Sequence, residues 1–223
     1  APFRWTIGRD SINMIQTIEL VVPKARMSKK ISVTLIFGGR SAEHEISLIS
    51  AAAIHRNLDK AKFDVRSVYI TRAGLWKPVE APLPDIAALE DGPAYSFLPW
   101  SAGAPAPAAE ADIYFPVLHG PFGEDGSIQG LLEMAGVPYV GAGVTGSALG
   151  MDKAVAKSIL RDHGLPVVPS LAVTETEWRA GGAAILRRIR RSLPLPVFVK
   201  PSNLGSSVGI TKVAEAGGLP AAL

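Results

Sequence analysis

The sequence predicts an α/β fold, in which a domain built on a parallel sheet is followed by the first part of an α+β domain. Residues 31–37 (ISVTLIF) are apolar at nearly every position, as in a strand that is buried on both faces. A glycine turn, a helical pattern over 41–59 with Ser41 as the N-cap candidate, and a second strand at 63–71 follow. A β-α-β unit of this kind pairs its strands in parallel through a right-handed crossover.

The rest of the first domain is less regular. Residues 76–111 are rich in Pro and Ala, which predicts surface excursions with one short hairpin. Order resumes with four further elements: a strand at 112–120, a helix at 127–135, a short strand at 137–140 and a helix at 147–163.

The pattern changes near residue 150. An α+β order follows, with a strand at 167–174, a helix at 175–191, and strands at 197–201 and 208–213 that flank a loop. Two or three strands with little to cover them make a poor core, so we expect this second domain to be truncated. The predicted segments are a leader or artefactual extension, expected to be disordered, at 1–26, the α/β domain at 27–150 and the truncated domain at 151–223. A targeting presequence is the alternative for 1–26.

Composition narrows the class of protein. Of 223 residues, 48% are hydrophobic and 19% charged, as in an ordinary globular protein. The absence of cysteine excludes a disulfide framework and a thiolate metal site. No apolar stretch approaches the roughly 18 residues of a transmembrane helix, so no membrane partner is expected. Four basic against two acidic residues in 1–26 supply +2 of the formal charge of +3, which leaves a weak case for nucleic-acid binding.

The loop within VFVKPSNLGSSVGITKV (197–213) has the composition of a phosphate cradle. Its glycines allow close backbone approach, its serines donate hydrogen bonds, and Lys200 supplies positive charge. It is not a Walker loop, because Lys200 precedes the glycines at the end of a strand instead of opening a helix. The alternative is a plain hairpin with a surface lysine.

Two further loops follow the carboxyl ends of predicted strands, where open α/β sheets bind ligands. One is HGPFGEDGSIQG, which begins at His119 and contains Glu124 and Asp125. The other is GGRSAE, which ends at Glu43 and opens a helix whose N–H groups favour an anion. The alternatives are a packed or surface histidine at 119 and, for Glu43, a carboxylate that stabilises the helix dipole.

Basic residues on two helices need separate interpretations. Lys153 lies early in a helix, where a cation gains nothing from the dipole, so either an anionic ligand or simple solvation explains it. Four arginines follow one another closely on the helix at 175–191, which favours a solvated face over a nucleic-acid patch; they are Arg187, Arg188, Arg190 and Arg191.

Three stretches together resemble the D-alanine:D-alanine ligases of the ATP-grasp superfamily: FGGRSAEHEISL (37–48), LHGPFGEDGSIQGLLEMAGVPYVGAGVTGSALGMDK (118–153) and VKPSNLGSSVGITKV (199–213). The resemblance implies a Rossmann-like, pre-ATP-grasp first domain and a truncated ATP-grasp central domain. It further implies a cytoplasmic enzyme of peptidoglycan precursor synthesis, homodimeric at full length, which joins two D-alanines through an acyl phosphate with ATP and Mg²⁺ or Mn²⁺. Its partners are D-alanine and ATP, with no nucleic acid and no membrane.

The resemblance also implies the catalytic and substrate-binding residues. Glu43 would hold the ammonium of the first D-alanine, and His119 would contact its carboxylate or the acyl phosphate. Ser206 would join Glu43 in a hydrogen-bond network beside the attacking amine.

Four residues are implied for ATP. Lys153 and Lys200 would neutralise its phosphates, Ser207 would cover them through its backbone N–H, and Glu124 would support the ATP-bound geometry.

The family's magnesium ligands, its oxyanion-stabilising arginine and its tyrosine-bearing mobile loop come after residue 223 in the family's order. We therefore expect no metal ligands and no ligase activity in these 223 residues alone. Two alternatives stay open: a D-alanine:D-lactate ligase, whose discriminating residues also lie beyond residue 223, and a non-catalytic nucleotide-binding fragment, which ATP would stabilise without turnover.

Overall fold

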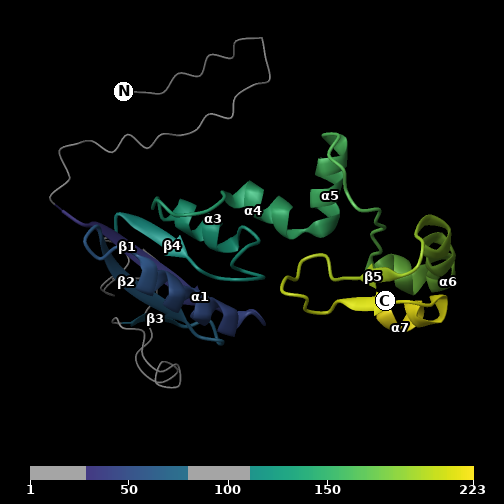
Figure 1. The fold of residues 1–223 in the computed structure, drawn as a ribbon, viewed down its shortest axis with the longest axis horizontal. Coiled ribbons are helices and arrows are strands. Elements are labelled where there is room, and N and C mark those ends of the chain that lie inside the picture. Colours follow the sequence, from purple (N-terminus) through teal and green to yellow (C-terminus); the bar gives the residue numbers. More distant parts are fainter. Residues whose placement is uncertain (1–28, 80–110) are drawn as a thin grey trace, which may run out of the picture. The chain divides into compact units, whose positions relative to one another are not determined.

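The computed structural model describes residues 29–79 and 111–223 (Figure 1). The expectations for 1–26 and for most of the excursion at 76–111 lie outside these residues. The chain forms two units, Ala1–Lys30 and Ile31–Leu223, and every element below belongs to the second. A boundary near residue 150 stays a prediction.

The first sheet has four strands in the order β3-β2-β1-β4 (Figure 1). Strand β1 (Ile31–Gly38) pairs in parallel with β2 (Phe63–Ile70) and with β4 (Ile113–Pro116). Helix α1 (His44–Asn57) connects β1 to β2, which confirms the predicted β-α-β unit. Strand β3 (Trp76–Val79) is antiparallel to β2, and the short hairpin predicted within 76–111 lies largely outside the described residues.

Side chains of β1 are buried on both faces of this sheet, which explains its continuous apolar run. Leu35 and Phe37 pack on one face with Leu48 of α1. Ile36 packs on the other face with Leu132 of helix α3 (Ser127–Met134). The carboxyl end of β1 is therefore fixed between two packed layers.

Two predictions for 137–163 are wrong in detail. The short strand at 137–140 is reduced to a single bridge between Tyr114 and Tyr139. The single helix predicted at 147–163 is two helices, α4 (Val144–Met151) and α5 (Lys153–Asp162). The break falls at Asp152, whose ψ of 106° is extended and whose side chain caps α5.

The carboxyl-terminal part has a two-stranded antiparallel sheet of β5 (Val197–Val199) and β6 (Thr211–Val213). Helix α6 (Glu175–Ser192) begins at a capping box of Thr174 and Glu177. A 3-10 turn (Ala216–Gly218) and the short helix α7 (Leu219–Ala222) end the chain.

The strand predicted at 167–174 does not form. Leu171 and Val173 instead pack against the small core that contains Ile185 and Val213. Their apolar alternation reflects this packing and not a strand pairing.

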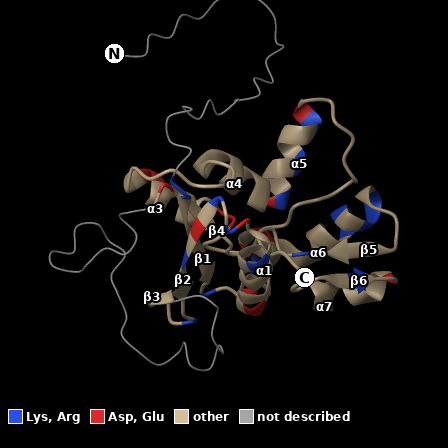
Figure 2. Cartoon of the chain, turned by 60° about the vertical axis from the view of Figure 1, so that its left-hand side comes forward, with Lys and Arg blue, Asp and Glu red and all other residues tan. Residues whose placement is uncertain are grey.

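Basic residues lie along α6 (blue in Figure 2), and arginines of the run contact other parts of the chain. Arg188 donates to the carbonyl of Ala172 at 3.1 Å and lies 3.5 Å from the Glu177 carboxylate. Arg190 donates to the carbonyl of Ala216 at 3.3 Å. These contacts favour the interpretation of the run as an ordinary surface face. Over 29–79 and 111–223 no helix is long and apolar enough to cross a membrane.

Candidate active site

The turn between β1 and α1 is built on two consecutive glycines with left-handed backbones, Gly38 (φ 90°) and Gly39 (φ 96°). The amide of Gly38 donates to Ser47 Oγ, and the amide of Gly39 donates to the carbonyl of Ile70, both at 2.7 Å. These bonds anchor the turn to α1 and to the end of β2.

Ser41 is not the N-cap of α1, contrary to prediction, because the helix begins one residue after Glu43. Ser41 Oγ accepts from the amide of Glu43 at 3.1 Å and donates to the carbonyl of His119 at 2.7 Å. Ser41 therefore links the turn after β1 to the segment after β4.

Glu43 is buried, with 6% of its surface exposed. Its Oε1 accepts a hydrogen bond from the hydroxyl of Ser206, 163 positions away. A Cβ on Gly120 would overlap Oε2, and a Cβ on Gly205 would lie 3.2 Å from Oε1. The structure thus brings two predicted site residues together and surrounds the carboxylate with side-chain-free backbone.

His119 is half-buried, and its ring faces a different partner. Nε2 lies 3.0 Å from Ser50 Oγ on α1, while the backbone carbonyl accepts from Ser41. The link from His119 to Glu43 therefore runs through the backbone and Ser41.

Glu124 holds the turn at Gly120, whose φ is 69°. Its Oε2 accepts from the amide of Gly120 at 2.8 Å, and its own amide donates to the carbonyl of Gly120 at 2.9 Å. Glu124 thus shapes the backbone beside the Glu43 carboxylate.

The predicted phosphate loop contains left-handed backbones at Ser206 (φ 46°), Ser207 (φ 64°) and Gly209 (φ 68°). Non-glycine residues rarely adopt this conformation, and such strained residues cluster at functional sites. The loop is closed by the amides of Val208 and Ile210, which donate to the carbonyls of Gly205 and Ser207. Successive N–H groups in turns of this type form anion-binding concavities.

The two predicted lysines make different contacts near this loop. Lys153 Nζ donates to the carbonyls of Ser202 at 3.2 Å and Leu204 at 2.5 Å, so it supports the loop from within. Lys200 is exposed, and its Nζ lies 5.9 Å from the centroid of the Phe198 ring.

Asp152 is a functional candidate that sequence reasoning missed. Its Oδ1 accepts from the amides of Ala154 at 2.9 Å and Val155 at 3.0 Å and from Ser202 Oγ at 2.7 Å. It therefore ties the first turn of α5 to the phosphate loop. An Asp directly before a helical pattern is an N-cap signal that could have located the break at 152.

The hydrogen bonds to Asp152 predict a measurable pH dependence. The amide of Val155, followed by the Ser202 hydroxyl, lowers the pKa of Asp152 below its ordinary value of 3.8. A lowered folded-state pKa gives stability that is present above 3.8 and is lost as the pH falls through the folded-state pKa. Asp152→Asn keeps an oxygen acceptor but does not titrate, so the stability difference between wild type and this variant should shrink below pH 3.8.

Urea unfolding at a series of pH values, from neutral to below pH 3.8, measures this difference. Asp152→Ala, the control that removes the capping side chain, should lower the free energy of unfolding by about 1 kcal/mol at neutral pH. If the difference in unfolding free energy between wild type and Asp152→Asn is the same at every pH, the lowered pKa of Asp152 is contradicted.

A cavity of about 310 Å³ lies beside the glycine turn, at the carboxyl ends of β1, β2 and β4. The guanidinium carbon of Arg40 lies 5.7 Å from the centroid of the Phe122 ring, and both side chains line the cavity. Glu43 and Ser206 do not line it. Its other walls come from Gly38, Gly39, Ser41, Ile70, Ala73, Gly74, Trp76, Leu118, His119, Pro121, Gly123, Ser127, Ile128 and Leu131.

Mg²⁺ finds no ligand set in the part of the chain that the structure describes. Among those residues, no three His, Asp or Glu side chains gather into a group that could hold a metal ion. None of the residues at 29–79 and 111–223 is therefore assigned to the metal, and no chemical step below is routed through it.

The chain combines an α/β sheet, in which β1 pairs in parallel with β2 and β4, with a glycine- and serine-rich loop that reaches Glu43 through Ser206. The family model for the D-ala D-ala ligase N-terminus matches residues 32–142, and that for the D-ala D-ala ligase C-terminus matches 159–223. The chain belongs to the D-alanine–D-alanine ligase family.

Curated relatives agree with this membership. The chain is 46% identical to the D-alanine–D-alanine ligase of Natranaerobius thermophilus over 195 residues, which cover 83% of this chain and 53% of the relative. It is 46% identical to that of Mycobacterium sp. (strain JLS) over 218 residues, 88% of this chain and 57% of the relative. The chain thus spans about half the length of the curated relatives it matches.

Solved structures show the same fold. The D-alanine-D-alanine ligase from Coxiella burnetii matches with a TM-score of 0.70 and 34% identity, over 86% of this chain and 59% of that chain. VanG D-Ala:D-Ser ligase from Enterococcus faecalis matches with a TM-score of 0.70 and 36% identity, over 87% of this chain and 58% of that chain.

Proposed function

We propose that this chain carries the first D-alanine site and the phosphate loop of an ATP-dependent D-alanine–D-alanine ligase. The observation that carries the proposal is the hydrogen bond from Ser206, in the phosphate loop, to the buried carboxylate of Glu43. This bond joins an amino-acid-binding position to a nucleotide-binding loop, as a reaction between the two substrates requires.

Glu43 suits the ammonium group of an amino acid. Among residues 29–79 and 111–223, no basic side chain forms an ion pair with it. A buried carboxylate without a cationic partner is costly. A substrate ammonium within hydrogen-bonding reach of the Glu43 carboxylate would supply the missing positive charge.

The substrate carboxylate would lie on the other side of Gly120, toward His119. The Ser41 bridge connects the carbonyl of His119 to the amide of Glu43, so both ends of a small amino acid would meet one rigid unit. His119 would contact the carboxylate or the acyl phosphate made from it. Glu124 would keep the Gly120 turn in place.

The phosphate loop would bind the phosphates of ATP. The left-handed backbones of Ser206 and Ser207 suit an anion, Ser207 would cover it through its N–H, and Lys200 would neutralise its charge. Lys153 would act mainly by holding the carbonyls of the loop, with its positive charge close beneath the phosphates. Catalysis would come from positioning and charge neutralisation.

The chemistry proceeds in two steps. A carboxylate oxygen of the first D-alanine attacks the γ-phosphorus of ATP, and the bond to the bridging oxygen breaks to release ADP. The amine of the second D-alanine then attacks the acyl carbon, phosphate leaves, and the amine loses a proton to form the peptide bond. The family implies Mg²⁺ as the metal, a homodimer and a cytoplasmic location, and we include these in the proposal.

The test uses a hybrid ligase, in which the 223 residues are extended after Leu223 by the segment that follows the matched region in the Natranaerobius thermophilus relative. With D-alanine, ATP and Mg²⁺ the hybrid should form D-alanyl-D-alanine and release one phosphate for each dipeptide. A hybrid that unfolds cooperatively and is stabilised by ATP, yet forms no dipeptide, would leave the chain as a non-catalytic nucleotide-binding module.

A second candidate concerns the second substrate. The solved structure of VanG D-Ala:D-Ser ligase is as similar to this chain as the solved D-alanine-D-alanine ligase from Coxiella burnetii, with a TM-score of 0.70 for each. The same assay should therefore include D-serine and D-lactate in competition with D-alanine. If the hybrid prefers D-serine or D-lactate as the second substrate, the proposed product changes accordingly, and the proposed site for the first D-alanine stays the same.

A further inference from the structure

We infer that His44, held by the hydroxyl of Tyr69, is a positioning residue for the Glu43 carboxylate. His44 fixes the glycine turn after β1, from which Glu43 projects. The inference rests on the proposed function, because it assigns a supporting residue to the same amino-acid site.

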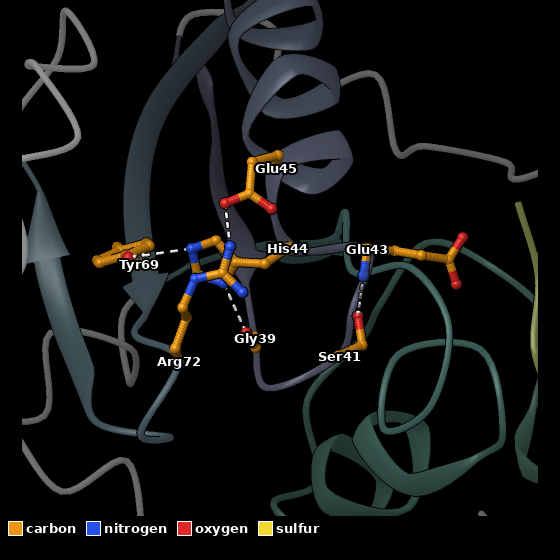
Figure 3. A network of polar contacts seen from close by, with 7 residues as sticks. All are labelled: Gly39, Ser41, Glu43, His44, Glu45, Tyr69 and Arg72. Carbon is orange, nitrogen blue, oxygen red and sulfur yellow. Dashed lines mark hydrogen bonds and ion pairs between the residues drawn. The ribbon is translucent and has the colours of Figure 1, made fainter. Parts of the chain in front are cut away.

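The His44 ring is buried, with 2% of the residue exposed, and both of its nitrogens have partners. Nδ1 lies 2.6 Å from the carbonyl oxygen of Gly39, and Nε2 lies 3.1 Å from the hydroxyl of Tyr69 (Figure 3). The Tyr69 ring, which is fully buried, meets the imidazole edge-on at a centroid distance of 5.6 Å. The imidazole is therefore clamped between strand β2 and the turn.

These partners define one tautomer of the neutral ring. A carbonyl oxygen only accepts hydrogen bonds, so Nδ1 must carry the proton and donate to Gly39. Nε2 is then an acceptor, and the hydroxyl of Tyr69 donates to it. The carbonyl of Gly39 thereby selects the tautomer, and the hydroxyl of Tyr69, which can donate or accept, adds a hydrogen bond that stabilises it.

The turn needs this constraint because it is made of two glycines, Gly38 and Gly39, both in the left-handed region. Glycine loses more conformational freedom on folding than any other residue, so an ordered glycine turn has to be held by hydrogen bonds. Gly38 is held by Ser47 and the amide of Gly39 by Ile70. His44 supplies a bond to the carbonyl of Gly39. Without it, the peptide between Gly39 and the next residue could rotate.

Rotation there would move the Glu43 carboxylate, because the turn leads within four residues to Glu43. Figure 3 shows the His44 ring and the Glu43 carboxylate on opposite sides of the start of α1. His44 therefore does not touch the substrate position and acts on Glu43 only through the backbone.

The first experiment reads the tautomer directly in the 223-residue protein. Long-range proton–nitrogen NMR on histidine-labelled protein should show His44 with its proton on Nδ1. In Tyr69→Phe this preference should weaken, while Tyr114→Phe, which removes another buried tyrosine hydroxyl, should leave it unchanged. A proton on Nε2 in the wild type would overturn the inference.

The second experiment measures the turn itself by native-state hydrogen exchange. In His44→Asn the side-chain amide can stand where Nδ1 stood and still donate to Gly39. In His44→Gln the amide reaches only the Nε2 position. The amides of Gly39 and Glu43 should exchange at least tenfold faster in the Gln variant than in the Asn variant, with the Leu35 amide in β1 unchanged. Equal exchange in both variants, or a uniform increase that includes Leu35, would show a merely structural histidine.

The third measurement separates this inference from the proposed function. In the hybrid ligase, His44→Gln should raise the KM for D-alanine at the first site about tenfold and lower kcat less, and His44→Asn should restore KM. If the exchange pattern is as expected but KM is unchanged, Glu43 is not the ammonium ligand and the proposed function fails at that residue. If KM rises equally in both variants, the positioning role of His44 fails.

Discussion

Replacing Gly38 by alanine is expected to destabilise the first sheet by more than about 3 kcal/mol, which is at the upper end of single-residue effects. A Cβ at this position would overlap the carbonyl oxygen of Ile70 and lie 2.8 Å from Cε2 of Tyr69. The first of these is a backbone atom at the carboxyl end of β2, where it accepts the hydrogen bond from the amide of Gly39, so it cannot move aside without breaking that bond. The φ of 90° adds strain that any side chain would suffer. Urea unfolding of the purified variant at neutral pH measures the loss.

Gly136→Ala is the matched control, because Gly136 is also left-handed (φ 67°) but a Cβ there would meet nothing within 4 Å. This control isolates the backbone term, which should cost about 1–2 kcal/mol. Equal destabilisation by both substitutions would mean that the contact with Ile70 contributes nothing, and that the turn relaxes freely when it is crowded.

The first sheet could be predicted from the sequence because burial on two faces leaves a clear signal. Seven of the eight positions of β1 are buried, and the chain shows this as an unbroken strand-forming run. The glycine pair at 38–39 then marks the turn, since only glycine adopts two consecutive left-handed backbones at no steric cost. Local pattern and tertiary packing agree here, so the parallel β-α-β unit was predictable.

The errors fall where local pattern and tertiary packing diverge. The apolar periodicity of 147–163 runs through Asp152, but the Asp152 side chain competes for the amides of the next turn and starts a new helix there. Alternation at 167–174 predicts a strand, yet the segment finds its apolar partners in a small core. Ser41 is a residue type that often caps helices, but its hydroxyl donates instead to the carbonyl of His119, 78 positions away.

The candidate site was predictable only loop by loop. Each loop was predicted to bind a ligand because glycine and charged residues follow a strand there, and this pattern is local to the loop. The contact between Glu43 and Ser206 joins residues 163 positions apart, and no spacing rule within either loop predicts it. The supporting residues His44 and Asp152 are less visible still, since their role lies in hydrogen bonds to backbone groups that the sequence does not display.

Glu43→Gln in the hybrid ligase is expected to lower kcat/KM for D-alanine about 100-fold, which corresponds to about 2.7 kcal/mol of lost transition-state stabilisation. The amide is isosteric, and its oxygen can still accept the hydrogen bond from Ser206. What it loses is the negative charge that would pair with the substrate ammonium. Stability should not fall, because a buried neutral amide costs less than a buried carboxylate without a cationic partner. A loss of activity with unchanged or raised stability marks a residue kept for function.

Glu45→Gln is the control for Glu43→Gln, since Glu45 lies two residues away, in the first turn of α1, and pairs with Arg72 at the surface. Removing that exposed charge should change kcat/KM less than about twofold and leave the urea midpoint nearly unchanged, because exposed ion pairs contribute little to stability. Initial rates over a range of D-alanine concentrations, with urea unfolding of each variant, give both quantities. If Glu43→Gln loses stability in proportion to activity, the carboxylate serves the fold, and the ammonium must be bound elsewhere. If only Glu43→Gln loses activity while both variants unfold like the wild type, the buried carboxylate of Glu43 serves to bind the substrate ammonium.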